Sequence, residues 1–550
     1  MKKSISYLKN ITLTINQLLF ITCCYIALIL NLPFLIKTSE AITSTHDYSV
    51  LFLITLPFFL LSITIVIQGF FSFRWIIKPI LILTVTSSAL IFYASLTYGI
   101  VFDYGMVQNT VETDSAEALS YLNFHSILFF ILFGLVPSLL IYFVKLSYTL
   151  FYKEFFSRIK LIGVSFGVAF LIGAIFYPNY ASVGRNNKDL IGYITPYKMV
   201  DSSIKFITTH YFYPPLEFKV LDTSPVIVRS NDRKHVTVMV LGETARAQNF
   251  SLNGYSKPTN QFTEDLGVVS FSNMSSCGTA TAVSVPCMFS RLNKNDYDKR
   301  IAIAQQNALD VIHLAGADVL WISNNNGSCK GVCTRVKSIK IPTNKSDPLC
   351  DGEYCYDEVL LRPLRKKLSN LSYDNTLIVL HMIGSHGPTY FKRYSKENSL
   401  FTPDCRRSDI QNCTKEQLIN TYDNTIAYTD LVLSQIIKAL DRLSNEKNIE
   451  TSLLYISDHG ESLGESGVYL HGLPYAFAPK EQTHVPMIFW SNKLQTDFNL
   501  SCLNNLTKSK VSHDSVFDIL LSIMSVKTTT YNVKNDPFVS CKSQDAIPRT

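Results

Sequence analysis

Charged residues are scarce in this chain of 550 residues: Asp, Glu, Lys and Arg make up 17% of it, against about 25% in a typical soluble protein. The shortage lies in the first third, because residues 1–177 hold 10 Lys and Arg and 7 Asp and Glu, whereas the remainder holds 40 and 36. The net charge of +7 divides into +3 and +4, so neither part has the concentrated basic surface of a nucleic-acid-binding protein. We therefore expect no nucleic-acid partner.

Glycine and proline are not abundant either, with 23 and 21 residues, and there is no internal repeat or low-complexity tract. Hydrophobic residues make up 47% of the chain. This composition excludes a collagen-like fibre and an intrinsically disordered protein.

Long apolar segments account for the missing charge. A membrane-spanning helix needs roughly 20 apolar residues, and five segments meet this length: Ile15–Ile36, Val50–Phe71, Ile77–Ile100, Phe124–Val144 and Ile159–Tyr177. The first could instead be a cleaved signal peptide, but its apolar run is too long and no small-residue cleavage site follows it. We expect a five-helix transmembrane domain over residues 1–177.

Basic residues in the short loops set the orientation, since cytoplasmic loops are rich in Lys and Arg. Nine of them fall before the first span, between the second and third, and between the fourth and fifth: Lys2, Lys3, Lys9, Arg74, Lys78, Lys145, Lys153, Arg158 and Lys160. The loop after the third span holds only acids. The N-terminus is then cytoplasmic, and everything after Tyr177 lies outside the cytoplasm.

The cysteines agree with this topology. Cys23 and Cys24 fall in the first span, and the other ten lie in the exported part, where an oxidising compartment favours disulfides. Pairing each cysteine with its nearest neighbour gives Cys277–Cys287, Cys329–Cys333, Cys350–Cys355, Cys405–Cys413 and Cys502–Cys541. A zinc site at Cys329 and Cys333 is the alternative.

The exported part begins with a polar linker over residues 178–230, which we expect to lie along the membrane surface. A catalytic domain over residues 231–550 follows. Its short β-branched runs predict buried strands at His235–Leu241, Asp318–Ile322, Thr376–Leu380, Ser452–Ile456 and Met487–Trp490. Apolar residues with helical spacing predict a helix from Lys415 to about Leu443. The fold class is α/β, a mostly parallel sheet with helices on both faces.

Unusual polar residues follow four of these runs. They are Gly242-Glu243-Thr244, Ser323 to Asn326, His381 with Gly384 to Gly387, and Ser457 to Glu461. Ligands of such sheets bind beyond the carboxyl ends of the strands. We predict an active site at this edge rather than an ordinary solvated edge.

Two carboxylates and an imidazole, from Glu243, Asp458 and His459, suit Zn²⁺ and are tolerable for Mn²⁺. The alternative for Asp458 and His459 is a helix N-cap followed by a surface histidine. A metal-activated nucleophile should be a hydroxyl, and the segment from Ser276 to Cys287 offers Ser276, Thr279, Thr281 and Ser284. Composition does not choose among them. A helix beginning near Thr281 would direct backbone N–H groups at an anion.

Six segments carry a more specific signal: VLGETAR from Val240, NFSLNGY from Asn249, SCGTATAVSVPCMFS from Ser276, GSHGPTYFKRY from Gly384, SDHGESLGE from Ser457 and YLHGLP from Tyr469. Together they resemble the lipid A phosphoethanolamine transferases, Gram-negative inner-membrane enzymes whose periplasmic domain has the alkaline phosphatase/sulfatase fold. The similarity spans essentially the whole chain, including the five spans and ten exported cysteines.

The resemblance implies one tight zinc site, formed by Glu243, Thr281, Asp458 and His459, with Thr281 as nucleophile. Whether a second zinc binds during turnover is left open. It also implies roles near the substrate for seven residues: Asn109, Thr113, Glu117, Asn326, Lys330, His386 and His471. His386 and His471 are candidates for acid–base catalysis, although histidines beside glycine are often structural. The implied donor is phosphatidylethanolamine, the acceptor is a phosphate of lipid A or lipopolysaccharide, the surroundings are inner-membrane lipids, and the chain is expected to be a monomer. Such a modification confers polymyxin resistance.

Other functions compete with this one. A phosphoethanolamine or phosphoglycerol transferase with another periplasmic acceptor would share the donor half-reaction. A sulfatase is disfavoured because Cys287-Met-Phe-Ser-Arg291 lacks the expected proline. A free phosphatase would not need five spans. A transporter or anchored binding protein is disfavoured because transporters carry ionisable residues within the bilayer, whereas here Lys78, His125 and Lys160 all lie at the ends of their predicted spans.

Overall fold

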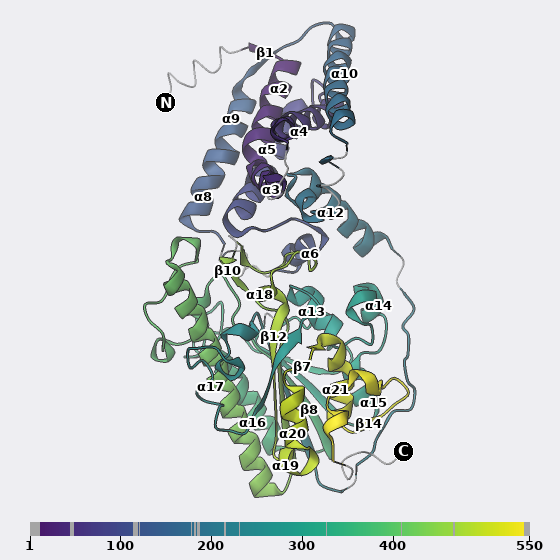
Figure 1. Cartoon of the computed structure of the whole chain (residues 1–550), viewed down its shortest axis with the longest axis vertical. Helices are drawn as coiled ribbons and strands as arrows, with labels where there is room; N and C mark the ends of the chain where they lie inside the picture. The colour runs from purple at the N-terminus through teal and green to yellow at the C-terminus, as the bar shows by residue number, and fades with distance from the viewer. Residues whose placement is uncertain are drawn as a thin grey trace. The chain divides into compact units, whose positions relative to one another are not determined.

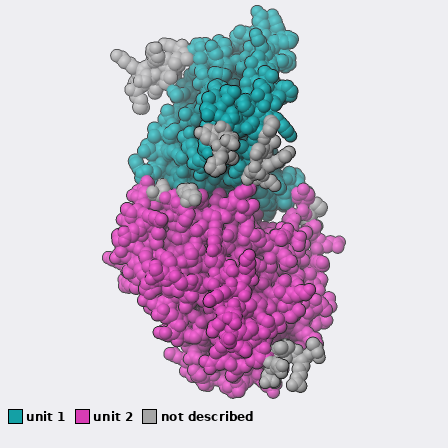
Figure 2. All heavy atoms as spheres, viewed as in Figure 1, with its two compact units in different colours: residues 1–107, 122–212 teal, residues 108–121, 213–550 magenta. Residues whose placement is uncertain are grey.

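The chain forms two compact units in a computed structural model that describes residues 12–43, 49–113, 119, 121–177, 179–180, 183, 187–213, 216–229, 231–325, 327–408, 410–465 and 468–543. The first unit comprises Met1–Val107 and Leu122–Phe212, and the second comprises Gln108–Tyr121 and Tyr213–Thr550 (Figure 2). The loop after the third predicted span therefore groups with the C-terminal part of the chain.

Apolar helices make up the first unit. Four of those in the described residues are long and apolar enough to span a membrane: α4 (Val50–Phe70), α5 (Ile77–Tyr98), α8 to α9 (Phe124–Phe143) and α10 (Phe151–Ile175). A fifth span is formed if the helix over Ile15–Leu30 (α2 with η1) and α3 (Leu32–Thr43) count as one. These positions agree with the five predicted segments.

The predicted first span is not straight, since its two helices meet at 55°. Pro33 lacks a backbone N–H, and Asn31 lies between the helices with its side chain fully buried. The Asn31 amide donates to Ile26 O at 2.9 Å and to Thr195 O at 2.8 Å, and its Oδ1 accepts from Thr195 N. Leu19 and Cys23 of the same helix are fully buried in the core of this unit. This packing argues against a cleaved signal peptide.

The predicted linker is partly helical. It contains η3 (Lys188–Tyr193), α12 (Tyr197–Ile207) and η4 (Thr208–Phe212). All three belong to the first unit.

An eight-stranded sheet forms the centre of the second unit, in the order β13-β5-β12-β9-β4-β8-β6-β7 (Figure 1). Its strands are β4 (His235–Gly242), β5 (Val269–Ser275), β6 (Asp318–Ser323), β7 (Lys337–Lys340), β8 (Asn375–His381), β9 (Glu450–Ser457), β12 (His484–Ser491) and β13 (Val511–Ser512). The adjacent strands β9, β4, β8, β6 and β7 are parallel. The sheet is mostly parallel, as predicted.

The strand predicted at Met487–Trp490 departs from the parallel pattern, because β12 runs antiparallel to both β9 and β5. A buried apolar run has the same composition in either direction, so the sequence pattern could not show this. Strands β5, β7 and β13 were not predicted. All four residues of β7 are exposed, which explains its lack of an apolar run.

Helices cover both faces of the sheet (Figure 1). One face packs against α15 (Ala308–Leu314) and α21 (Val516–Ile523), which share a core with Met239 and Leu241 of β4. The other face carries α16 (Leu361–Ser369) and α17 (Lys415–Lys447). The Thr414 side chain caps the start of α17, and Asn448 follows its last turn in a left-handed conformation. The helix thus ends at Lys447, four residues beyond the predicted end.

The shorter helices of this unit are α13 (Thr281–Met288), α14 (Lys299–Ile303), α18 (Lys480–Thr483), α19 (Leu494–Asp497) and α20 (Leu500–Leu506). Five disulfides join Cys277–Cys287, Cys329–Cys333, Cys350–Cys355, Cys405–Cys413 and Cys502–Cys541. These are the nearest-neighbour pairs. The Cys329–Cys333 bond leaves no thiolate for the alternative zinc site.

Candidate active site

The carboxyl ends of four parallel strands bring polar side chains together. Glu243 follows β4, Asn325 follows β6, His381 ends β8 and Asp458 follows β9. Glu243, His381 and Asp458 are fully buried, and Asn325 is 7% exposed. Because β8 and β9 pair in register on either side of β4, residues far apart in the sequence meet at one edge.

Glu243, Asp458 and His459 form a compact group of metal-ligand type. One ligand atom from each lies within 4.8 Å of the others, and all three residues are buried. The His459 Nε2 is 3.2 Å from Glu243 Oε1 and 3.6 Å from Asp458 Oδ2. No helix begins at Asp458, so the N-cap alternative is wrong.

This group fits a metal cation. The Asp458 Oδ2 is buried and has no hydrogen-bond partner in the described part of the chain, although its Oδ1 accepts from the backbone N–H groups of Thr244 and His459. The His459 Nδ1 lies 2.9 Å from Gly460 O and donates to it, so Nε2 is the ring nitrogen that faces the carboxylates and could ligate a metal. A buried carboxylate oxygen without a partner is costly unless a cation or proton neutralises it.

The pKa shifts of the three side chains also favour a bound cation or proton. Burial and the neighbouring Glu243 raise the pKa of Asp458 to about 7. Burial opposes protonation of His459, yet the two carboxylates raise its pKa to about 10. Burial would also raise the pKa of Glu243, but His459 holds it well below its usual value. The site therefore favours one added positive charge among the three side chains.

Among the four candidate hydroxyls between Ser276 and Cys287, that of Thr281 reaches this group. Its Oγ1 donates to Glu243 at 3.0 Å (Oε1) and 3.1 Å (Oε2), and it lies 3.4 Å from His459 Nε2. Thr281 is the first residue of α13, as expected for a helix beginning there, and it is 8% exposed.

The other three hydroxyls of the segment make bonds elsewhere. Ser276 donates to Gly278 O, Thr279 donates to Leu473 O at 2.6 Å, and Ser284 accepts from Gly278 N. The tertiary structure thus singles out Thr281 among the four alternatives.

Two more histidines lie beside the group. The ring centroid of His471 is 4.3 Å from that of His459 and 5.5 Å from that of His386. The Nδ1 of His471 lies 3.2 Å from Oε1 of the buried Glu461. His386 and His471 are 7% and 9% exposed, so both rings border the metal-ligand group while keeping a small contact with solvent.

Two supporting residues have roles that the sequence did not show: Asn325 was placed at the sheet edge without a role, and His513 was missed. The Asn325 amide donates to Glu243 Oε2 at 2.7 Å and thereby orients this carboxylate. His513 accepts from Cys277 N at Nδ1 and donates from Nε2 to Ser457 O, which ties the Thr281 segment to the end of β9. No local motif marks His513, because both partners are more than 50 residues away.

A basic pair lies on the same unit. Glu112 of α6 (Tyr104–Glu112) contacts Lys299 Nζ at 2.5 Å and Lys330 Nζ at 3.5 Å. Burial alone would raise the pKa of Glu112, but Lys299, Gln108 and Lys330 together outweigh it and lower the pKa. Lys330 also lowers the pKa of His381, after the larger effect of burial, so its charge is felt at the sheet edge.

The remaining predicted substrate residues are only partly described. Thr113 donates to the backbone carbonyl of Asn109 at 2.7 Å, and both side chains are partly exposed. Asn326 and Glu117 lie outside the described residues.

An apolar helical unit joined to an α/β unit with a buried group of metal-ligand type and a hydroxyl beside it is the arrangement of a membrane enzyme of the sulfatase and alkaline phosphatase type. The Sulfatase family model matches residues 235–526, and the model described as phosphoethanolamine transferase EptA/EptB matches residues 60–211. The chain is 38% identical to phosphoethanolamine transferase EptA of Escherichia coli K12 over 97% of its own length and 98% of that protein. The chain belongs to the EptA phosphoethanolamine transferase family.

Other relatives agree. Phosphatidylethanolamine transferase Mcr-1 of E. coli is 37% identical, covering 90% of this chain and 92% of Mcr-1. The structure of the integral membrane protein EptA from Neisseria meningitidis matches with a TM-score of 0.91 at 34% identity, covering 97% and 99% of the two chains. The periplasmic domain of EptC from Campylobacter jejuni matches at 45% identity, with a TM-score of 0.51, over 58% of this chain and 97% of that domain. This chain is accordingly a multi-pass inner-membrane protein with its C-terminal domain in the periplasm.

Proposed function

We propose that this protein transfers phosphoethanolamine from phosphatidylethanolamine to a phosphate of lipid A. The observation that carries the proposal is the Thr281 hydroxyl, hydrogen-bonded to Glu243 inside the buried Glu243, Asp458 and His459 group. Mcr-1, named as a phosphatidylethanolamine transferase, and EptA support the donor and the transferred group.

Glu243, Asp458, His459 and the Thr281 oxygen would hold a zinc ion. Two carboxylates, one imidazole and one oxygen match the ligand preferences of Zn²⁺. When bound, the ion lowers the pKa of a ligated hydroxyl and neutralises charge on phosphate oxygens.

In the first half-reaction, Thr281 Oγ1 forms a bond to the phosphorus of phosphatidylethanolamine, and the bond to the diacylglycerol oxygen breaks. The hydroxyl proton leaves toward Glu243, to which Thr281 already donates. The departing oxygen takes a proton from a histidine, for which His386 and His471 are the candidates. Diacylglycerol is released and phosphoethanolamine remains on Thr281.

In the second half-reaction, an oxygen of a lipid A phosphate attacks the same phosphorus. The bond to Thr281 Oγ1 breaks, the threonine regains its proton from Glu243, and the histidine takes up the proton that the attacking phosphate hydroxyl loses. This reverses the geometry of the first step, so the same residues serve both.

Lys330 and Lys299 supply positive charge for the acceptor. Their ammonium groups hold the two oxygens of the Glu112 carboxylate, at 2.5 Å for Lys299 and 3.5 Å for Lys330. A phosphate oxygen can replace a carboxylate oxygen in such a pair, since both are anionic acceptors. The resemblance to the family implies a role near the substrate for Lys330. We infer the same role for Lys299, because both lysines contact Glu112.

The test is mass spectrometry of lipid A from a susceptible Gram-negative host that expresses the full-length protein. The expected result is lipid A heavier by phosphoethanolamine, together with raised tolerance to polymyxin. The Thr281→Ala protein, inserted at the same level, should give neither. Unmodified lipid A would refute lipid A as the acceptor if the cells still convert phosphatidylethanolamine to diacylglycerol. That conversion would show that the protein is active and would favour another periplasmic acceptor.

A further inference from the structure

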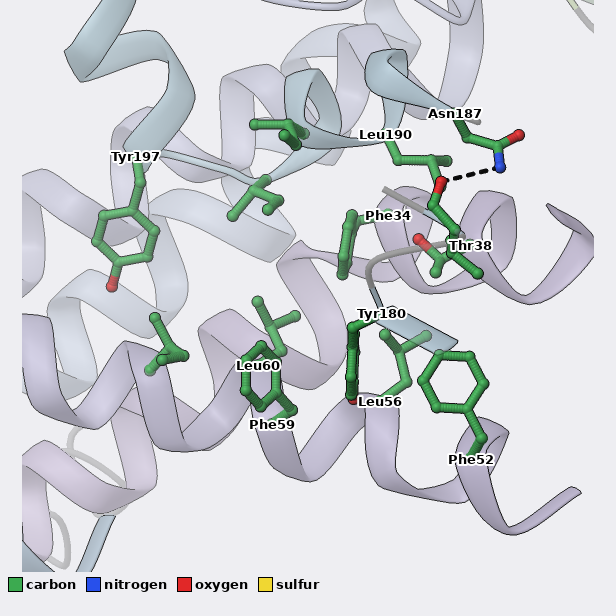
Figure 3. A pocket seen from close by; sticks show the side chains of 14 residues that line it. Phe34, Thr38, Phe52, Leu56, Phe59, Leu60, Tyr180, Asn187, Leu190 and Tyr197 are labelled. Carbon is green, nitrogen blue, oxygen red and sulfur yellow. Dashed lines mark hydrogen bonds between the residues drawn. The ribbon is translucent and has the colours of Figure 1, made fainter. Parts of the chain in front are cut away.

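The first unit contains an apolar cavity of about 200 Å³. It is lined by side chains of α3, of the first two-thirds of α4 and of residues 180, 183, 187, 190, 191, 194 and 197 (Figure 3). All of these segments belong to the same unit.

The wall of the cavity is almost entirely carbon. Rings and aliphatic side chains such as Phe34, Phe59 and Leu60 face one another across it (Figure 3), and none of its fourteen lining residues is charged. Protein interiors are close-packed, and an engineered apolar cavity of about 150 Å³ already binds benzene rather than water. A larger space with such a wall therefore suits an apolar ligand and is unsuited to water.

One polar atom in the wall has no partner. Thr38 is 4% exposed, and its Oγ1 makes no hydrogen bond in the described part of the chain. In Figure 3 this hydroxyl is on the side of Thr38 that faces Phe34. The other polar groups are engaged: Tyr180 with Thr55, Asn187 with the backbone carbonyl of Val183, and Tyr197 with Gln68. The Thr38 hydroxyl can therefore donate a hydrogen bond to a mostly apolar ligand.

The helix α4 both forms part of the cavity wall and is long and apolar enough to span a membrane. Its side chains Leu51, Ile54 and Phe58 are 63%, 54% and 56% exposed, as expected for the lipid-contacting face of a span. Phe52, Leu56 and Phe59 of the same turns line the cavity. They lie on the other side of α4, and the cavity reaches the surface of the helical unit at Phe59 and Ile63, which are partly exposed, and at Ile191, which is 53% exposed. Because α4 is long and apolar enough to span a membrane, an acyl chain is the apolar ligand available to such an opening.

We propose that this cavity binds one acyl chain of a membrane phospholipid, with the Thr38 hydroxyl donating to the ester carbonyl of that chain. An ester carbonyl is the acceptor that every diacyl phospholipid carries at the head of its chain. Because no lining residue is charged, binding selects the chain and not the headgroup. The lipid is a resident of the membrane unit, and its retention does not depend on the transfer reaction.

The experiment is native mass spectrometry of the full-length protein, purified in a mild detergent and exposed to mixed phosphatidylethanolamine and phosphatidylglycerol. The wild-type protein should retain one phospholipid of either headgroup. Leu60→Trp, which fills the cavity, should reduce retention at least tenfold, whereas Ile54→Trp on the exposed face of the same helix should not. Thr38→Val, which keeps the shape and removes the hydroxyl, should weaken retention several-fold.

Three outcomes would overturn the proposal. They are retention unchanged in a folded Leu60→Trp protein, retention unchanged in Thr38→Val, and strict dependence on one headgroup. Should Leu60→Trp fail to fold, the isosteric Thr38→Val decides alone. The Thr281→Ala protein should lose transfer activity and still retain lipid like the wild type. Transfer activity therefore tests the transferase proposal, and lipid retention tests this one.

Discussion

Replacing the proposed nucleophile tests the reasoning about the site most directly. Thr281→Ala removes the oxygen that donates to Glu243 at 3.0 and 3.1 Å. Removing a nucleophile from a preorganised site costs about 10⁴-fold or more in rate, corresponding to roughly 5 kcal/mol of lost transition-state stabilisation. We expect transfer by Thr281→Ala to fall to the background.

Thr281→Ser keeps the oxygen and loses the methyl group. The serine side chain has three staggered positions of which one directs Oγ at Glu243, so the productive population falls roughly threefold. Loss of a buried methyl group costs about 0.8 kcal/mol of stability. We expect the serine variant to retain roughly a third of the activity and to fold normally.

The assay is a single turnover with phosphatidylethanolamine alone, followed by mass spectrometry of the intact protein and of its peptides. The wild-type and Thr281→Ser proteins should gain one phosphoethanolamine on the peptide containing residue 281, and Thr281→Ala should gain none. Full transfer by Thr281→Ala, or a label on Thr279, would refute the assignment. Circular dichroism and zinc content of each variant serve as folding controls.

Three further predictions follow from the same structure. Zinc removal by a chelator, or Asp458→Ala, should lower zinc content, activity and melting temperature together, because the buried carboxylates lose their neutralising charge; a metal-free protein that turns over normally would exclude the metal role. Burial lowers the pKa of His235, His381 and His513 to about 3, 4 and 3, so these rings are neutral in the folded protein and take up protons on unfolding. Their stabilising contribution is complete above the unfolded pKa of about 6.5 and is lost as pH falls toward the folded values, by up to about 1.4 kcal/mol per pH unit per ring. Buried groups with raised pKa values, such as Asp458, have the opposite dependence, so the measurement compares melting curves of the wild type and His235→Gln between pH 8 and pH 5; an equal pH dependence in the two proteins contradicts it. Thiol titration of the denatured, non-reduced protein should find only the two cysteines of the first span, since the other ten are in disulfides, whereas twelve reactive thiols would contradict the pairing.

Much of the fold could be predicted because its signals are local. Uncharged runs of about 20 residues predict membrane helices whatever they pack against. The β-branched run before Glu243 and the run before Asp458 gave the positions of β4 and β9, and the carboxyl ends of parallel neighbours lie at one edge. Two metal-ligand candidates from distant segments could thus be placed together from sequence alone. Cysteines four to ten residues apart pair because short loops bring them close.

The tertiary structure decided what depends on long-range contacts. Four hydroxyls in one segment are equivalent in composition, and only the tertiary structure brings the start of α13 to Glu243 at the end of β4, which gives Thr281 its contact. His513 and Asn325 support the site through partners more than 50 residues away. The antiparallel direction of β12 and the bend at Asn31 also come from distant pairing, with β9 and with Thr195. Local patterns in the sequence determine which segments are buried. Which of their side chains meet is determined by the spatial order and direction of the strands and helices in the fold.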